Sequence, residues 1–127
     1  MDPRILLVDD EPQLLKMMSL YLVRRGFAVT TAASTEQAWQ EMQADPSAFA
    51  IAVLDATMAG MSMEELALRI LNANPSVAVI TASGYPVVMS ALEAAAPGRV
   101  MFLHKPFTAD MLVDAVRRML GSQEEGL

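Results

Sequence analysis

The sequence predicts an α/β domain in which helices cover both faces of a parallel sheet. Short apolar runs and helix-forming segments alternate five times along the 127 residues, which is the pattern of such domains. Four runs, 5–8, 49–54, 77–82 and 100–103, are almost wholly apolar, as is typical of strands buried on both faces. Segment 27–32 alternates large and small side chains instead. This predicts an edge strand with one face less buried.

Turn and capping residues between these strands mark the helices. Pro12 suits a first helical turn, and Ser34 and Ser62 each precede a Gln or Glu by three residues, which forms a capping box. Helices are predicted over 12–25, 35–44, 63–72, 86–95 and 109–120. The helix over 86–95 begins poorly, because no good capping residue precedes Val87 and Val88. We expect one domain over residues 1–121 and a flexible C-terminal tail over 122–127.

The composition narrows the classes of function. An apolar fraction of 54% with 19% charged residues indicates a globular chain. The formal charge of −6 and the pI near 4.6 argue against direct nucleic-acid binding. The sequence has no apolar stretch of membrane-spanning length, no signal-peptide pattern and no cysteine. We therefore expect a cytoplasmic protein with no membrane partner.

Polar residues follow four of the predicted strands at the point where each strand ends. They are Asp9 with Asp10, then Asp55, then Ser83, and finally Lys105, which precedes a proline. Because parallel strands end at the same edge of a sheet, these side chains are expected to lie together. Each residue alone has an ordinary structural role as a helix cap, a turn residue or a surface lysine. Their joint placement favours a functional site.

Three clustered carboxylates repel one another unless a cation neutralises them. Mg²⁺ prefers oxygen ligands, whereas zinc is disfavoured here because the chain has no cysteine and His104 is its only histidine. An aspartate beside Mg²⁺ can attack phosphorus to give an aspartyl phosphate. The metal, the Lys105 ammonium and the Ser83 hydroxyl would then stabilise charge on the transferred oxygens.

This order of residues resembles the receiver domain of bacterial two-component response regulators, over about residues 4–120. The resemblance implies a flavodoxin-like (βα)₅ doubly wound sheet with strand order 2-1-3-4-5, an order for which a chemotaxis regulator is a standard example. An edge position for segment 27–32 fits that order.

Carried over position by position, the resemblance implies a role for each residue. Asp55 would accept a phosphoryl group from a sensor histidine kinase or a phosphotransfer domain. Asp10 and Asp55 would bind Mg²⁺ directly and Asp9 through water, while the backbone carbonyl of Thr57 would be a further ligand. Lys105 would pair with the phosphoryl group, and its bond to the following proline would be cis.

The hydroxyl that senses phosphorylation requires a choice between Thr81 and Ser83, which point the same way from a strand. Ser83 lies level with the other strand ends, 28 residues after Asp55 and 22 before Lys105, the usual family spacing. We therefore choose Ser83. Phe102 matches the family's aromatic switch residue, although a core aromatic on an edge strand is an equal alternative.

The segment after Asp55 departs from the family pattern. Ala59 replaces the usual proline and Met63 the usual glycine. These departures leave the chemistry intact but place the rigidity of the loop in question.

The predicted function is a phosphorylation switch and not an enzyme. The switch would assist only its own phosphorylation and dephosphorylation. Phosphorylation would reshape the face formed by segments 86–95, 100–103 and 109–120, where a second copy or an effector would bind. One alternative is a degenerate receiver that acts as a constitutive interaction module. Another is a phosphatase with Asp55 as nucleophile, but Ala56 and Thr57 provide no partner carboxylate and the short loops provide no cap.

Overall fold

A central parallel sheet organises the chain. The structure, a computed structural model, describes residues 4–55, 61–84 and 89–125. Its elements in chain order are β1 (Arg4–Val8), α1 (Pro12–Arg24), β2 (Ala28–Ala32), α2 (Thr35–Ala44), β3 (Ile51–Asp55), α3 (Met63–Ala73), β4 (Ala78–Ser83), α4 (Ser90–Ala95), β5 (Val100–His104) and α5 (Ala109–Glu125). All neighbouring strands pair in parallel in the order β2-β1-β3-β4-β5. The predicted flavodoxin-like topology, including the edge position of β2, is confirmed.

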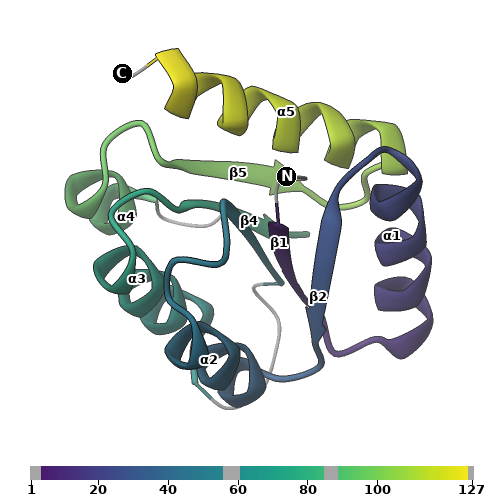
Figure 1. Cartoon of the computed structure of the whole chain (residues 1–127), viewed down its shortest axis with the longest axis horizontal. Helices are drawn as coiled ribbons and strands as arrows, with labels where there is room; N and C mark the ends of the chain where they lie inside the picture. Colours follow the sequence, from purple (N-terminus) through teal and green to yellow (C-terminus); the bar gives the residue numbers. More distant parts are fainter. Residues whose placement is uncertain (1–3, 56–60, 85–88, 126–127) are drawn as a thin grey trace.

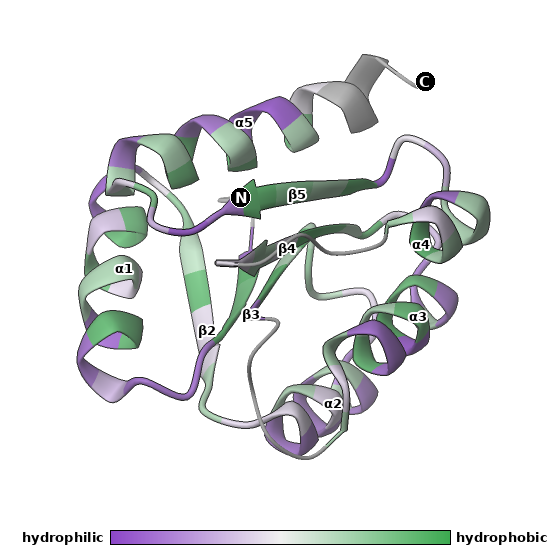
Figure 2. Cartoon of the chain, turned by 180° about the vertical axis from the view of Figure 1, so that it is seen from behind, coloured by the Kyte–Doolittle hydropathy of each residue, from purple (hydrophilic) through white to green (hydrophobic). Residues whose placement is uncertain are grey.

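Two apolar cores lie on opposite faces of this sheet. Alternate strand residues point to opposite faces, so Leu6 and Leu54 pack with α2, α3 and α4, whereas Ile5 and Val53 pack with α1 and α5. Figure 1 shows these two helical layers, and Figure 2 shows how hydrophobic the strands between them are. Burial on both faces explains why the central strands are continuous apolar runs. None of the helices among the described residues is long and apolar enough to cross a membrane.

The predicted caps largely form. Ser34 and Ser62 accept hydrogen bonds from the backbone N–H three residues on, at 3.0 and 3.1 Å, and Thr108 does the same for Met111 at 3.1 Å. Gly26, at φ +96°, supplies the left-handed residue that stops α1. By contrast, α4 has no side-chain cap, because Met89 occupies that position. The helix α1 likewise has no side-chain cap hydrogen bond, and its first turn begins with Pro12.

The largest difference from the predicted helix boundaries is at the end of α5. The helix α5 continues to Glu125 instead of ending at Leu120. Gly121 does not adopt the left-handed conformation that stops a helix, and the glutamine and glutamates that follow are good helix formers. The helix α4 begins at Ser90, while its predicted start at Pro86 lies outside the described residues.

Arg99 joins three backbone segments at the edge of the sheet opposite the predicted site. Its guanidinium donates hydrogen bonds to the carbonyls of Asn74 at 2.7 Å, Val77 at 2.9 Å and Leu71 at 3.4 Å. Partial burial lowers the pKa of Arg99, yet a guanidinium stays charged at neutral pH. The planar fork thus ties the end of α3 to the start of β4.

We expect Arg99→Ala to lower the free energy of unfolding by about 2 kcal/mol, because carbonyls bonded to a charged donor lose their partner. Arg99→Lys should recover less than half of this loss, since a lysine cannot reach several carbonyls in one plane. Urea unfolding measures both variants. Arg69→Ala is the matched control, because exposed Arg69 makes only a helical pair with Glu65 and should cost no more than about 0.5 kcal/mol. Equal losses for Arg99→Ala and Arg69→Ala would contradict this role.

Candidate functional site

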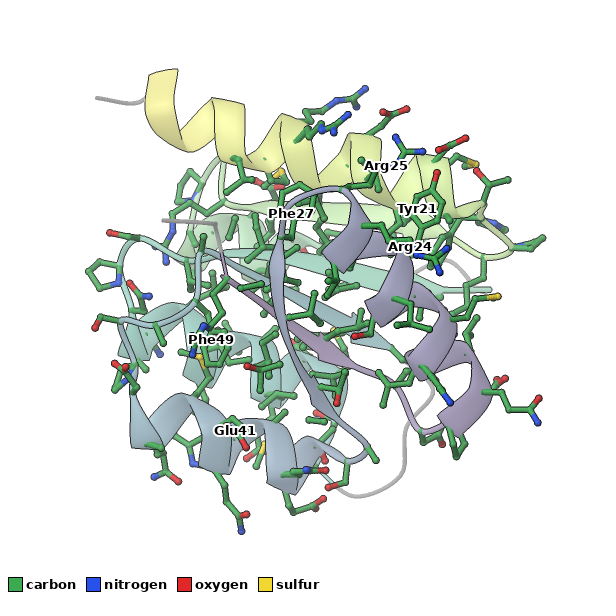
Figure 3. The ribbon with its side chains drawn as sticks, turned by 45° about the vertical axis from the view of Figure 1, so that its right-hand side comes forward. Tyr21, Arg24, Arg25, Phe27, Glu41 and Phe49 are labelled. Carbon is green, nitrogen blue, oxygen red and sulfur yellow. The ribbon has the colours of Figure 1, made fainter. Side chains whose placement is uncertain are left out.

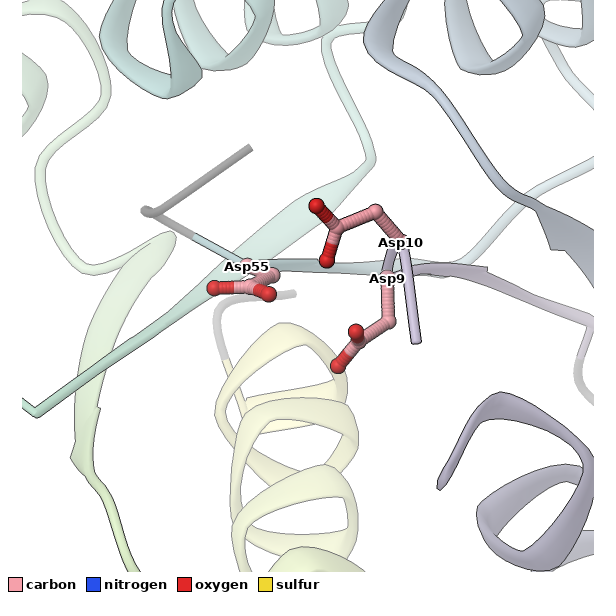
Figure 4. A group of neighbouring side chains, drawn as sticks. All are labelled: Asp9, Asp10 and Asp55. Atoms are coloured by element: carbon pink, nitrogen blue, oxygen red, sulfur yellow. The ribbon is translucent and has the colours of Figure 1, made fainter. Parts of the chain in front are cut away.

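Three carboxylates meet at the carboxyl edge of the sheet. Asp9 and Asp10 follow β1, and Asp55 is the last residue of β3. Since Val8 pairs with Leu54, the next residues of both strands are brought side by side. One oxygen from each of the three carboxylates lies within 4.8 Å of the others (Figure 4). Asp9 and Asp55 are buried, whereas Asp10 is exposed.

Lys105 supplies the cation of this cluster. Its Nζ lies 3.2 Å from Oδ1 of Asp55 and 3.9 Å from Oδ2 of Asp9. The backbone fixes its position, because the Lys105 N–H donates to the Ser83 carbonyl at 2.8 Å. The bond from Lys105 to Pro106 is cis, as the family resemblance implied.

The environment of Asp9 is unfavourable for a bare carboxylate. Burial raises the pKa of Asp9, and the charge of Asp55 raises it further. A hydrogen bond from the Glu11 N–H at 2.9 Å and the nearby Lys105 ammonium oppose this increase only in part. Negative charge is thus in excess at this edge of the sheet.

This donor set suits a hard divalent cation. All the converging ligand atoms are carboxylate oxygens, which Mg²⁺ prefers, and exposed Asp10 leaves one side open to water. Asp10 and Asp55 would hold the ion, with Asp9 beside them. Thr57, the further ligand implied by the resemblance, lies outside the described residues.

We expect Asp9→Asn to raise the melting temperature of the metal-free protein at pH 7. Because the pKa of Asp9 is higher in the folded than in the unfolded state, protonated Asp9 stabilises the fold at low pH. This stabilisation is lost as the pH rises through the folded-state pKa. Asparagine keeps the Oδ1 acceptor for the Glu11 N–H. The increase in melting temperature that it causes should therefore be larger at pH 7 than at pH 4. Calorimetry in EDTA measures it, with exposed Asp114→Asn as control. A gain independent of pH would count against this electrostatic cause.

The two candidate hydroxyls lie at different depths in β4. Thr81 pairs with Leu54 in the sheet, and its hydroxyl donates to Sδ of Met89 at 3.4 Å. Ser83 is the last residue of β4, beyond the residue opposite Asp55, and is also buried. Ser83 thus lies level with the carboxylates, while Thr81 contacts the core. The role of Ser83 itself stays a prediction.

Phe102 is half-buried on edge strand β5, beside Thr81. Its ring packs edge to face against exposed His104, at 6.1 Å between centroids. Among the described residues it is grouped with neither apolar core, and its role as a switch residue stays a prediction.

The sequence did not reveal one contact near the site. The Glu36 carboxylate, in the first turn of α2, accepts a hydrogen bond from the Met61 N–H at 3.3 Å. Backbone hydrogen bonds, including this one, lower the pKa of Glu36. The contact fixes the end of the segment that follows Asp55. Its only signal in the sequence is an acidic residue at a helix start, which is common.

Comparisons with known proteins agree with this geometry. The family model described as "Response regulator receiver domain" matches residues 5–117. Among curated proteins, the C4-dicarboxylate transport transcriptional regulatory protein DctD of Rhizobium meliloti is 34% identical over 91% of this chain, which spans 25% of that regulator. The response regulator receiver protein CpdR of Brucella abortus is 28% identical, covering 92% of this chain and 96% of that protein. The chain thus spans about a quarter of the first relative and nearly all of the second.

Solved structures give the same picture. A CheY-like receiver domain protein from Methanospirillum hungatei superimposes with a TM-score of 0.87 at 24% identity over all of both chains, which shows the fold. The response regulator TrrA from Thermotoga maritima, in complex with Mg(2+)-BeF, has a TM-score of 0.77 at 28% identity over 92% of this chain and 98% of its own.

Proposed function

Because this chain belongs to the response regulator receiver domain family of two-component signalling, we propose that it is a phosphorylation switch whose acceptor is Asp55. The observation that carries the proposal is the cluster itself. Three carboxylate oxygens lie within 4.8 Å of one another, and an ammonium lies 3.2 Å from the acceptor. Opposite charges arranged in this way suit the transfer of an anionic phosphoryl group.

In the proposed reaction, a carboxylate oxygen of Asp55 attacks phosphorus and the bond from phosphorus to the donor breaks. Bound Mg²⁺ would supply charge neutralisation at the transferred oxygens. Lys105, already beside Asp55, pairs with the incoming phosphoryl group. Ser83, at the same level of the sheet, donates its hydroxyl to a phosphoryl oxygen.

The donor is a histidine of a sensor kinase or a phosphotransfer domain, since receiver domains of response regulators are phosphorylated by histidine kinases. The chain would catalyse no reaction on another substrate. We place it in the cytoplasm with these partners, without direct contact to nucleic acid or membrane.

The signal would pass through the face formed by α4, β5 and α5. The helix α4 spans only Ser90–Ala95 and has no side-chain cap, so it costs little to remodel. Movement of Ser83 towards a phosphoryl oxygen would open space beside Thr81, into which half-buried Phe102 turns. A second copy or an effector would bind the altered face.

Incubation with acetyl phosphate, with Mg²⁺ or with EDTA, tests the proposal by intact mass. We expect one phosphoryl adduct that forms only with Mg²⁺. No adduct, together with no binding of beryllofluoride, would contradict the proposal and support a constitutive interaction module. Rapid multiple turnover of an added phosphate ester would instead support a phosphatase.

A further inference from the structure

The hydroxyl of Thr81 is buried next to the start of α4. Thr81 has no exposed surface in β4, and a hydroxyl in such a place needs a hydrogen-bond partner. In the described part of the chain it reaches two acceptors, Sδ of Met89 at 3.4 Å and the Met101 carbonyl at 3.5 Å. The first distance is ordinary for sulfur, which is larger than oxygen, whereas the second is at the outer limit for an oxygen acceptor. The thioether of Met89 is therefore the main partner of this hydroxyl.

Met89 is also the residue at which α4 begins. It occupies the N-cap position without a side-chain cap, and its carbonyl accepts a hydrogen bond from the Glu93 N–H in the first turn, at 2.9 Å. Its half-buried side chain packs against the apolar core that α2, α3 and α4 cover. Figure 3 shows Phe49 of this core on the side of α2, away from Tyr21 on α1. The contact with Thr81 thus holds the start of α4 to the sheet.

Phe102 lies beside this contact. It pairs with Thr81 across β4 and β5, and paired residues of neighbouring strands project from the same face of a sheet. The space around the Thr81 side chain is filled, since Thr81 has no exposed surface, and Met89 fills part of it. A ring that turns inward beside Thr81 would therefore displace Met89.

We propose that the contact between Thr81 and Met89 is a latch that holds the switch in its resting state, and that Met89 transmits the turn of Phe102 to α4. This inference rests on the proposed function, because the turn of Phe102 follows phosphorylation of Asp55. In the resting state the Thr81 hydroxyl is bonded to sulfur. In the active state it loses this partner, and Met89 moves away together with the first turn of α4. Removing either the hydroxyl or the sulfur thus destabilises the resting state and shifts the population towards the active one.

Beryllofluoride with Mg²⁺ tests the latch, because it mimics a phosphoryl group on an aspartate and binds the active state. Calorimetric titration measures its dissociation constant. We expect Thr81→Val and Met89→Leu, which nearly keep the volume of each side chain, each to bind beryllofluoride about threefold more tightly than wild type, the effect of one weak hydrogen bond. The double variant should bind no more tightly than either single variant, because both changes remove the same contact. Without beryllofluoride, the amides of residues 90–95 should exchange hydrogen faster in both single variants.

Thr31→Val and Met17→Leu are the matched controls. Thr31 is exposed on β2, and Met17 is 61% exposed on α1, so neither change should alter the dissociation constant or the exchange of α4. Single variants with wild-type affinity, or a double variant whose gain is the product of the two single gains, would overturn the latch. Binding by wild type would still support the proposed function in that case. No binding of beryllofluoride by wild type would overturn both.

Discussion

Replacing Lys105 with alanine is expected to slow phosphorylation from acetyl phosphate by about 100-fold, the usual loss when one preorganised charge-stabilising donor is removed. The ammonium lies 3.2 Å from Asp55, so it is in place before the donor arrives. The time course of adduct formation by intact mass, at saturating Mg²⁺, measures the rate.

Two comparisons make this result specific. Lys16→Ala, an exposed lysine of α1, should leave the rate unchanged. Mg²⁺ should still raise the melting temperature of Lys105→Ala, because the three carboxylates remain. A rate within a few-fold of wild type would contradict a role for Lys105 in the transfer. Loss of the Mg²⁺ effect would assign Lys105 to metal binding instead.

Replacing Ile80 with alanine is expected to lower the free energy of unfolding by 2–5 kcal/mol, which is the usual range for a large aliphatic residue in a core. Ile80 is completely buried on β4, where it pairs with Val53 and Met101. The sheet is covered on both sides, so surrounding atoms have little room to fill the cavity.

Urea unfolding measures this loss as a lower midpoint at an unchanged slope. Val23→Ala is the control, because Val23 is 51% exposed and should change the free energy of unfolding by no more than about 0.5 kcal/mol. A loss below 1 kcal/mol for Ile80→Ala would show that the core tolerates the cavity, contrary to the packing described here.

The sequence predicted the features that depend on local patterns. The four apolar strands, the weaker edge strand and the caps at Ser34 and Ser62 each follow from neighbouring residues. The convergence of Asp9, Asp10 and Asp55 also followed, because parallel strands end at a common edge. Position along the predicted strand distinguished Ser83, at its end, from Thr81, two residues earlier. In the sheet, Thr81 pairs with Leu54 and Ser83 lies one residue beyond the partner of Asp55.

Features that depend on tertiary contacts were not predicted. Arg99 bonds carbonyls 22 to 28 residues earlier in the chain, and nothing in its local sequence indicates them. The last helix was predicted to end at Leu120 but continues to Glu125, because Gly121 does not adopt the left-handed conformation of a glycine that ends a helix.

The position of the phosphoryl group after reaction with acetyl phosphate and Mg²⁺ tests the central claim most directly. Borohydride reduction converts an aspartyl phosphate into homoserine, so peptide mapping of the reduced protein locates the acceptor. We expect homoserine at position 55 in wild type and in the control Asp114→Asn, and neither adduct nor homoserine in Asp55→Asn. An adduct of undiminished yield in Asp55→Asn, or homoserine at position 9 or 10 in wild type, would contradict the assignment of Asp55 as the acceptor.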